Sequence, residues 1–185
     1  MEVSPTQLPG VLVIRTSLFR DHRGSFRETW QADRYAEHGI PGTFVQDNAA
    51  VSRRGVLRGL HYQLPDPQGK LVGVLAGAVY DVAVDIRHGS ATFGQWIARE
   101  LSAENGRQLW IPAGFAHGYL VLSDTAVLAY KCTTPYRGEA ARAIAWNDPQ
   151  LAIPWPCTDP VLSDADARAP RLADLAQDAL PGASA

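Results

Sequence analysis

Short runs rich in β-branched and aromatic residues recur along this chain, and glycine, proline, aspartate or asparagine separates most of them. The runs expected to form strands are residues 11–15, 26–30, 43–51, 56–64, 71–76, 78–86, 95–100, 108–111, 119–122, 125–131 and 143–146. Many short strands joined by close turns are typical of an all-β sandwich or barrel. The pattern therefore predicts an all-β fold, with Gly77 in a tight hairpin between two of its strands.

Two short flanking helices are also expected. Residues 31–38 end just before Gly39, a residue type that commonly stops helices. Residues 171–179 carry leucines near helical spacing and precede Pro181. The final residues, 181–185, are predicted to be disordered. A length of 185 residues without an internal linker or repeat favours one domain over residues 1–185.

Charge and hydropathy exclude several classes of function. The net charge of −2 provides no basic footprint for nucleic acid. No apolar run approaches the roughly 18 residues that a membrane span needs. Residues 1–10 lack the basic and apolar regions of a secretion signal. Cys132 and Cys157 show no metal-ligand spacing, so we expect free thiols in a reducing, cytoplasmic environment.

The segment 56–63 combines an imidazole and a guanidinium within one expected strand. His61 and Gln63 have the same parity and therefore share a face of the strand. Arg58 lies three residues before His61, and Gly59 between them is a candidate for a β-bulge that re-aims its neighbours. This pattern indicates a polar pocket inside a β-structure, with a base and an anion-binding group close together.

Two glycine–histidine spacings resemble the motifs of the cupin family, whose fold is a double-stranded β-helix, or jelly roll. Gly106, Pro112 and His117 match the spacing of the second motif, and Gly55 and His61 match the start of the first. The family's metal site also needs a second histidine and a glutamate in the first motif, and this chain has neither in place. Two histidines alone make a poor metal site, so we predict a cupin-like jelly roll without a metal.

Longer motifs resemble the dTDP-4-dehydrorhamnose 3,5-epimerase family. They comprise residues 44–48, 55–63, 68–72, 80–87, 92–96, 101–105, 108–112, 114–118 and 128–131. The resemblance extends from about residue 11 to about residue 170. It implies a cupin jelly roll that works as a homodimer without metal or other cofactor. The implied substrate is a dTDP-4-dehydro-6-deoxyhexose, epimerised at C3 and C5.

Epimerisation beside a ketone needs three groups. A base removes the carbon-bound proton, a cation or donor stabilises the enolate oxygen, and a second group returns a proton to the opposite face. The resemblance assigns the base to His61, its orienting carboxylate to Asp166, the enolate contact to Lys70 and the acid to Tyr130. Asp164 is the rival of Asp166. Without the resemblance, these side chains would be interpreted as a satisfied core histidine, a solvated lysine and a core tyrosine.

The resemblance also implies a set of substrate-binding residues. Arg58 would contact the diphosphate, because a guanidinium binds phosphate with two parallel hydrogen bonds. The other implied contacts are Gln46 and Asn48 near the nucleotide, His117 and Asp81 in the cavity, Tyr136 beside the sugar, and Arg23, Phe26 and Glu28, which reach the partner subunit's site. Asp81 could instead belong to a structural hydrogen-bond network. His22, His38 and His88 match no role and are expected at the surface.

Two segments depart from the family pattern. In residues 132–139, where two aromatic residues commonly stand, only Tyr136 remains and Pro135 occupies the first position. Ala49 and Ala50 follow Asn48 where the family often has histidine and serine. The first segment borders the sugar pocket, so a C3-only or C5-only mono-epimerase stays open as an alternative. The sequence also leaves room for a keto-isomerase acting on the same class of nucleotide, a metal-dependent cupin enzyme or a sugar-nucleotide binding module.

Overall fold

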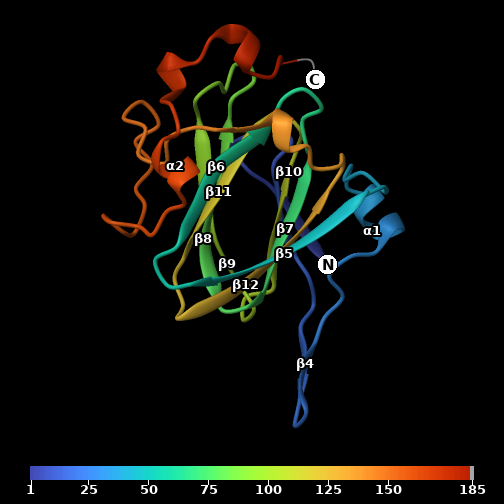
Figure 1. The fold of residues 1–185 in the computed structure, drawn as a ribbon. Coiled ribbons are helices and arrows are strands. Elements are labelled where there is room, and N and C mark those ends of the chain that lie inside the picture. The colour runs from blue at the N-terminus through green and yellow to red at the C-terminus, as the bar shows by residue number, and fades with distance from the viewer. Residues whose placement is uncertain (184–185) are drawn as a thin grey trace.

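A computed structural model describes residues 1–183 of the chain, which form two facing antiparallel sheets and a projecting hairpin (Figure 1). The six-stranded sheet contains, in spatial order, β1 (Glu2–Pro5), β2 (Leu12–Arg15), β10 (Arg107–Ile111), β7 (Lys70–Ala76), β12 (Thr125–Cys132) and β5 (Gln46–Arg53). The five-stranded sheet contains β13 (Ala141–Ala143), β6 (Leu57–Gln63), β11 (Phe115–Val121), β8 (Ala78–Asp85) and β9 (Trp96–Ser102). The arrangement confirms the predicted all-β, cupin-like jelly roll.

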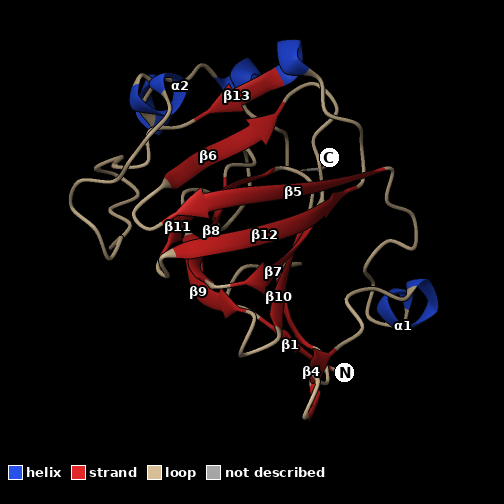
Figure 2. Ribbon diagram, turned by 60° about the horizontal axis from the view of Figure 1, so that its bottom comes forward, coloured by secondary structure: helices blue, strands red, loops and turns tan. Residues whose placement is uncertain are grey.

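The remaining elements flank the sheets. They are the hairpin β3 (Phe19–Asp21) and β4 (Gly24–Phe26), the helices α1 (Ala32–Ala36) and α2 (Asp164–Ala167), and the 3₁₀ turns η1 (Gly138–Ala140), η2 (Leu172–Asp174) and η3 (Gln177–Ala179). Figure 2 places α2 beside β13 and β6, and α1 at the far side of the molecule. Within residues 1–183, no helix has the length and apolarity that a membrane crossing requires.

The main core lies between the two sheets. Alternate residues of β7 and β12, including Val72, Val74 and Leu128, are fully buried against residues of the opposite sheet such as Ala83 and Phe115. Side chains alternate between the two faces of a strand, so their neighbours point to the outer faces. Each outer face consequently needs a cover of its own.

The chain ends supply those covers. On the outer face of the five-stranded sheet, Trp155, Leu172 and Leu180 from the C-terminal segment pack into a second apolar cluster. On the outer face of the six-stranded sheet, Tyr35 of α1 packs with Trp110 in a third cluster. The C-terminal segment therefore lies directly behind β6, the strand that carries His61.

Two local predictions were wrong. Gly77 joins strands of different sheets, so it turns the chain from one sheet to the other instead of closing a hairpin. A Cβ there would lie 2.2 Å from the backbone oxygen of Thr125, so only glycine fits. Residues 171–179 form the separate turns η2 and η3 instead of a helix. The leucines of this segment pack against the five-stranded sheet. Two short turns place them there as well as a helix would.

The predicted disordered tail is also wrong for residues 181–183. Pro181 is buried, and its oxygen accepts a hydrogen bond of 2.7 Å from the backbone of His88. The amide of Ala183 donates back to the His88 oxygen at 3.0 Å. Sequence composition does not reveal such pairing with a distant loop. Residues 184–185 lie outside the described residues.

Other expectations are confirmed. The helix predicted over residues 31–38 is α1, and the Gln31 side chain caps it by accepting a hydrogen bond from the amide of Arg34 at 2.6 Å. Cys132 and Cys157 are free thiols. The three histidines without a matching role, His22, His38 and His88, are exposed.

Asp85, at the end of β8, is a fully buried carboxylate that fixes the following loop. Its Oδ1 accepts from Arg87 Nε at 2.9 Å, and its Oδ2 accepts from Ser90 Oγ and Thr92 Oγ1, both at 2.6 Å. Burial alone would raise the pKa of Asp85, but the hydrogen bonds from Arg87, Ser90 and Thr92 outweigh it and lower the pKa to about 2. The carboxylate is therefore ionised in the folded protein at any mildly acidic pH.

A lowered pKa in the folded state stabilises the fold above the unfolded-state pKa, about 3.9 for aspartate, and this contribution is lost as the pH falls toward the folded-state value. We expect the unfolding free energy of the wild type to drop by about 2 kcal/mol more than that of Asp85→Asn between about pH 6 and about pH 2. Urea denaturation at a series of pH values measures the difference. Parallel pH profiles for the two proteins would contradict the assignment.

Candidate active site

A β-bulge in β6 sets the directions of its polar side chains. His61 lies opposite His117 of β11, whereas Arg58 lies opposite Tyr119, so three residues of β6 advance over two of β11. Directly opposed residues share a face of the sheet, and Tyr119 belongs to the core between the sheets. Arg58 and His61 therefore both face the interior.

Gly59 is the residue that permits this bulge. Its φ is +128°, and a Cβ there would lie 2.5 Å from the Cα of Gly118. Any larger residue would therefore clash with β11. Simple alternation would place Arg58 and His61 on opposite faces, whereas the bulge expected at Gly59 brings them to the same face.

The C-terminal segment brings a carboxylate to His61. Val161 donates to the oxygen of Gly55, just before β6, at 2.8 Å and accepts from the amide of Leu57, the first residue of β6, at 3.0 Å. Ser163 then caps α2, because its Oγ accepts from the amide of Asp166 at 3.1 Å. These contacts place Oδ1 of Asp166 2.5 Å from Nε2 of His61. The expected histidine–carboxylate pair is thus present, and Asp166, not the exposed Asp164, forms it.

The electrostatics of this pair define the tautomer of the histidine. The Asp166 side chain is 4% exposed and that of His61 is 46% exposed. Burial alone would raise the pKa of Asp166, but the hydrogen bond and charge of His61 outweigh burial and lower the pKa. An ionised carboxylate only accepts hydrogen bonds, so Nε2 of His61 carries the proton. Nδ1 is left with a free lone pair, as a base requires.

A cavity of about 300 Å³ opens at this pair. It is lined by all four residues predicted to be catalytic, together with Gln63 and Tyr136. The four catalytic candidates come from β6, β7, β12 and α2. The fold thus brings together residues that are up to about a hundred positions apart in the sequence. The structure therefore brings His61, Lys70, Tyr130 and Asp166 to one site.

Lys70 and Tyr130 lie on neighbouring strands on the six-stranded side of this cavity. The Lys70 Nζ is 5.9 Å from the centre of the Tyr130 ring. Burial lowers the pKa of Lys70, and the charge of Asp81 opposes only part of this shift. Burial raises the pKa of Tyr130, so its phenol is neutral and able to donate a proton at neutral pH. A lysine and a neutral phenol thus face the same space as the histidine pair.

A second polar group occupies the same inner face, outside the lining of this cavity. His117 Nε2 lies 2.9 Å from Oδ2 of Asp81, and both residues are buried. Arg58 donates from Nε to Oγ of Ser52 at 3.1 Å. The hydrogen bond between Asp81 and His117 fits the alternative interpretation of Asp81, in which it belongs to a structural network. Its Oδ1 is nevertheless buried without a hydrogen-bond partner among residues 1–183, so both interpretations of Asp81 persist.

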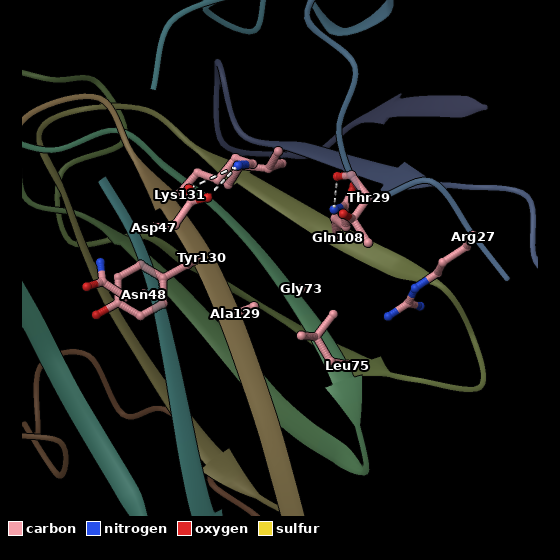
Figure 3. Close-up of a pocket in the computed structure, with 11 residues that line it drawn as sticks. Arg27, Thr29, Asp47, Asn48, Gly73, Leu75, Gln108, Ala129, Tyr130 and Lys131 are labelled. Carbon is pink, nitrogen blue, oxygen red and sulfur yellow. Dashed lines mark hydrogen bonds and ion pairs between the residues drawn. The ribbon is translucent and has the colours of Figure 1, made fainter. Parts of the chain in front are cut away.

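Gln46 and Asn48 bond to each other, with Nε2 of Gln46 2.9 Å from Oδ1 of Asn48. Asn48 also borders a separate hollow of about 150 Å³ over the six-stranded sheet, shown in Figure 3. Gly73 and Ala129 lie in the middle of that hollow, and an ion pair of 2.9 Å joins Asp47 to Lys131 at its edge. It contains no histidine, so the larger cavity is the candidate active site.

The residues expected to reach a partner subunit are absent from the lining of the His61 cavity. Arg23 and Phe26 are on the hairpin that projects from the body in Figure 1. Phe26 is 72% exposed, and Arg23 pairs with Asp21 at 2.6 Å. Glu28 forms an ion pair with Arg34 just beyond the hairpin. Within one chain, these residues do not line the cavity of His61.

Donor groups for a metal do not gather here. Across residues 1–183, no three side chains of histidine, cysteine, aspartate or glutamate lie close enough together to hold an ion. His61 and His117 each contact a carboxylate, through separate pairs. The residues that the cupin motifs supply therefore act as two hydrogen-bonded pairs.

Sequence reasoning missed several residues around the site. Ser52, which bonds Arg58, gave no signal because β5 and β6 belong to different sheets. Gln68 lines the cavity, and Gln63 lines it as a buried residue, but neither was assigned a role. The shared face of His61 and Gln63 was the only available hint.

Comparison with known proteins agrees with this arrangement. The family model described as dTDP-4-dehydrorhamnose 3,5-epimerase matches residues 5–174. A dTDP-4-dehydrorhamnose 3,5-epimerase of Pseudomonas aeruginosa PAO1 is 51% identical over 94% of this chain and 97% of its own length. The chain belongs to the dTDP-4-dehydrorhamnose 3,5-epimerase family. The resemblance on which the site assignments were based is therefore confirmed at the level of the family.

Solved structures extend the match to the whole epimerase fold. The dTDP-6-deoxy-D-glucose-3,5-epimerase of Legionella pneumophila, solved with dTDP-4-keto-L-rhamnose, has a TM-score of 0.95 and 53% identity, covering 100% of this chain and 99% of that one. A 3′-monoepimerase of Streptomyces bikiniensis, solved with dTDP-quinovose, has a TM-score of 0.91 and 35% identity over 97% of this chain and 93% of that one. One- and two-centre epimerases thus share this fold.

Proposed function

We propose that this protein epimerises a dTDP-4-dehydro-6-deoxyhexose at C3 and C5, without a metal. The observation that carries the proposal is the convergence of the His61–Asp166 pair, Lys70 and Tyr130 on one cavity. Together they supply the base, the enolate contact and the second proton donor that inversion beside a ketone needs. A binding module would need none of these three groups.

The reaction begins with proton abstraction. The free Nδ1 of His61 takes the proton from the carbon beside the C4 ketone, and the C–H electron pair moves into the carbonyl to form an enolate. Asp166 stabilises the imidazolium that results, because its carboxylate is buried and ionised. It also fixes the ring orientation through the hydrogen bond to Nε2.

Lys70 and Tyr130 complete the inversion. The enolate oxygen gains negative charge beside Lys70. This charge favours the ammonium form of Lys70 against the burial that lowers its pKa, and the attraction between the two charges is strong because the site is desolvated. Tyr130 then gives its phenolic proton to the carbon from the face opposite His61. Proton exchange with solvent returns His61 to its neutral form and Tyr130 to its phenol, and repeating the sequence at the other carbon beside the ketone produces the doubly inverted sugar.

Incubation with the 4-keto-6-deoxyglucose nucleotide in heavy water tests the proposal. Each inversion replaces a carbon-bound proton with a deuteron, so mass spectrometry should show two deuterons in the product, and NMR should place them at C3 and C5. One deuteron would identify a mono-epimerase, the alternative that the altered segment 132–139 and the Streptomyces bikiniensis structure keep open. A ketone found at a new carbon would identify a keto-isomerase.

The two aspartates that competed as partners of His61 provide a matched pair of variants. Asp166→Asn keeps the shape but removes the charge and allows the wrong tautomer, so turnover should fall by about 10²–10⁴. Asp164→Asn, two residues away on the exposed side of α2, should stay within about twofold of the wild type. Steady-state turnover rates of the two variants and the wild type measure the difference. Equal rates for the two variants would refute the role of Asp166.

The substrate-binding assignments and the homodimer belong to the same proposal. Arg58, Gln46, Asn48, His117 and Asp81 bind the dTDP-sugar from within the chain, and Arg23, Phe26 and Glu28 bind the nucleotide in the partner's site. The exposed aromatic rings of the projecting hairpin, Phe19 at 64% and Phe26 at 72%, support a reach to a second copy. Mixing Arg23→Ala with His61→Ala subunits tests it, since each mixed dimer would regain one intact site. No recovery would contradict the exchange of hairpins.

A further inference from the structure

The loop 133–137, which carries the departure from the family pattern, is fastened to the barrel by three glutamine side chains. Gln68 donates from Nε2 to the oxygen of Thr134 at 2.8 Å. Gln46 accepts at Oε1 from the amide of Tyr136 at 2.7 Å. The third glutamine, Gln63, bonds to the residues on both sides of Tyr136.

Gln63 is the central member of this group. It is 3% exposed and two residues from His61 on β6. Its Nε2 donates to the oxygens of Asp66 at 2.7 Å and Pro135 at 3.2 Å, and its Oε1 accepts from the amide of Arg137 at 2.9 Å. Both ends of the amide are thus used, and their partners are backbone groups that hold their positions whatever side chains the loop carries.

The loop places Tyr136 at the wall of the cavity that contains His61, Lys70 and Tyr130. The Tyr136 ring is largely exposed, at 61%, so packing against the core contributes little to its position. The backbone on either side of it is held by Gln63 instead. The position of this ring relative to the sugar therefore depends on a buried amide in the strand of the catalytic histidine.

We propose that Gln63 is a positioning residue: it holds Tyr136 against the bound sugar, and this contact retains the singly inverted intermediate long enough for the second inversion. The inference rests on the proposed function and extends it to the order of events. After the first inversion the sugar must stay bound while its ring changes shape, so release competes with the second proton transfer. If Tyr136 is held less firmly, release is favoured, because a displacement of the sugar by about 1 Å is enough to slow the second proton transfer strongly.

The chemistry of each step balances within the proposed function. At the first carbon a C–H bond breaks, His61 takes the proton, and the electron pair enters the enolate. The enolate then takes a deuteron from the Tyr130 hydroxyl on the opposite face to form a C–D bond, and exchange with heavy water deprotonates His61 and returns a deuteron to Tyr130. Nothing is oxidised or reduced. Release at this stage gives a product with one deuteron, whereas completion gives two. The ratio of singly to doubly labelled product at low conversion therefore measures the retention of the intermediate.

The experiment compares the wild type with Gln63→Ala in heavy water. We expect the singly labelled fraction to rise on the order of tenfold in the variant, while dTDP affinity stays within about twofold. Hydrogen exchange adds a local readout, because the amide of Arg137 donates to Gln63 and should exchange faster in the variant. Tyr136→Ala should raise the singly labelled fraction in the same way. Because Tyr136 is exposed, this substitution should leave the core undisturbed.

Gln108→Ala is the matched control. Gln108 is also a buried glutamine that bonds at both ends, with the Tyr35 hydroxyl at 2.6 Å and the Thr29 oxygen at 2.8 Å, but on the outer side of the six-stranded sheet. The Gln108→Ala variant should be less stable than the wild type but should have the same ratio of singly to doubly labelled product. An unchanged ratio in both Gln63→Ala and Tyr136→Ala would overturn the proposal, as would a wild-type product with a single deuteron. A wild type that incorporates no deuterium would instead overturn the proposed function.

Discussion

Replacing His61 with alanine is expected to lower turnover by about 10²–10⁴, the usual range for removing a general base. The imidazole is the group that takes the carbon-bound proton in the proposed reaction. Asp166 contacts the ring at Nε2, on the side away from the basic Nδ1, so its carboxylate is not placed to replace Nδ1 as the base. Deuterium incorporation at both carbons should fall with turnover, since every exchange begins with abstraction. Rates from NMR in heavy water measure both quantities.

The same variant should keep its fold and its affinity for dTDP. His61 is 46% exposed, so its removal leaves little buried void, although it leaves the Asp166 carboxylate without its partner. Titration calorimetry with dTDP serves as the control for folding and nucleotide binding. Wild-type deuterium incorporation in a His61→Ala protein that binds dTDP normally would assign abstraction to another residue.

The sequence predicts much of this architecture for physical reasons that are local. Alternating apolar residues and turn residues mark most strands within a few positions, as with β7, β8 and β12. The expected bulge at Gly59 is present because a glycine inside a strand often marks a close approach of two backbones, here to Gly118. The short helix α2 was not among the expected helices, and the Asp166 carboxylate that it delivers was identified only through the family resemblance.

The features that escaped prediction depend on contacts between distant segments. Gly77 looks like a hairpin turn in sequence, and only the pairing of β7 and β8 with other strands shows that the chain changes sheet there. Pro181 resembles the start of a disordered tail until its pairing with His88 is known. The fastening of the loop 133–137 was invisible for the same reason, because Gln63 and Arg137 are far apart in sequence.

Tyr130→Phe is expected to have the second large effect on turnover. The reason is that His61 removes the proton and Tyr130 returns one, so the two steps depend on different residues. The substitution removes only the hydroxyl, so the ring still packs against the core between the sheets. Without the phenolic donor, we expect inverted product to form about 10²-fold more slowly or worse. Abstraction by His61 does not need the phenol, so deuterium should still enter the carbon, returned by the imidazole on the face from which the proton left.

Tyr130→Phe is therefore expected to incorporate deuterium with retained configuration, a result that sets it apart from His61→Ala. NMR of the recovered nucleotide sugar distinguishes the labelled starting epimer from the inverted product, and His61→Ala, which should show neither, is the matched control. The raised pKa of Tyr130 strengthens the expectation, because the wild-type phenol is fully protonated at neutral pH and its loss removes a donor instead of a base. Loss of exchange together with inversion would mean that Tyr130 participates in abstraction, and the assignment of opposite faces to His61 and Tyr130 would then be wrong.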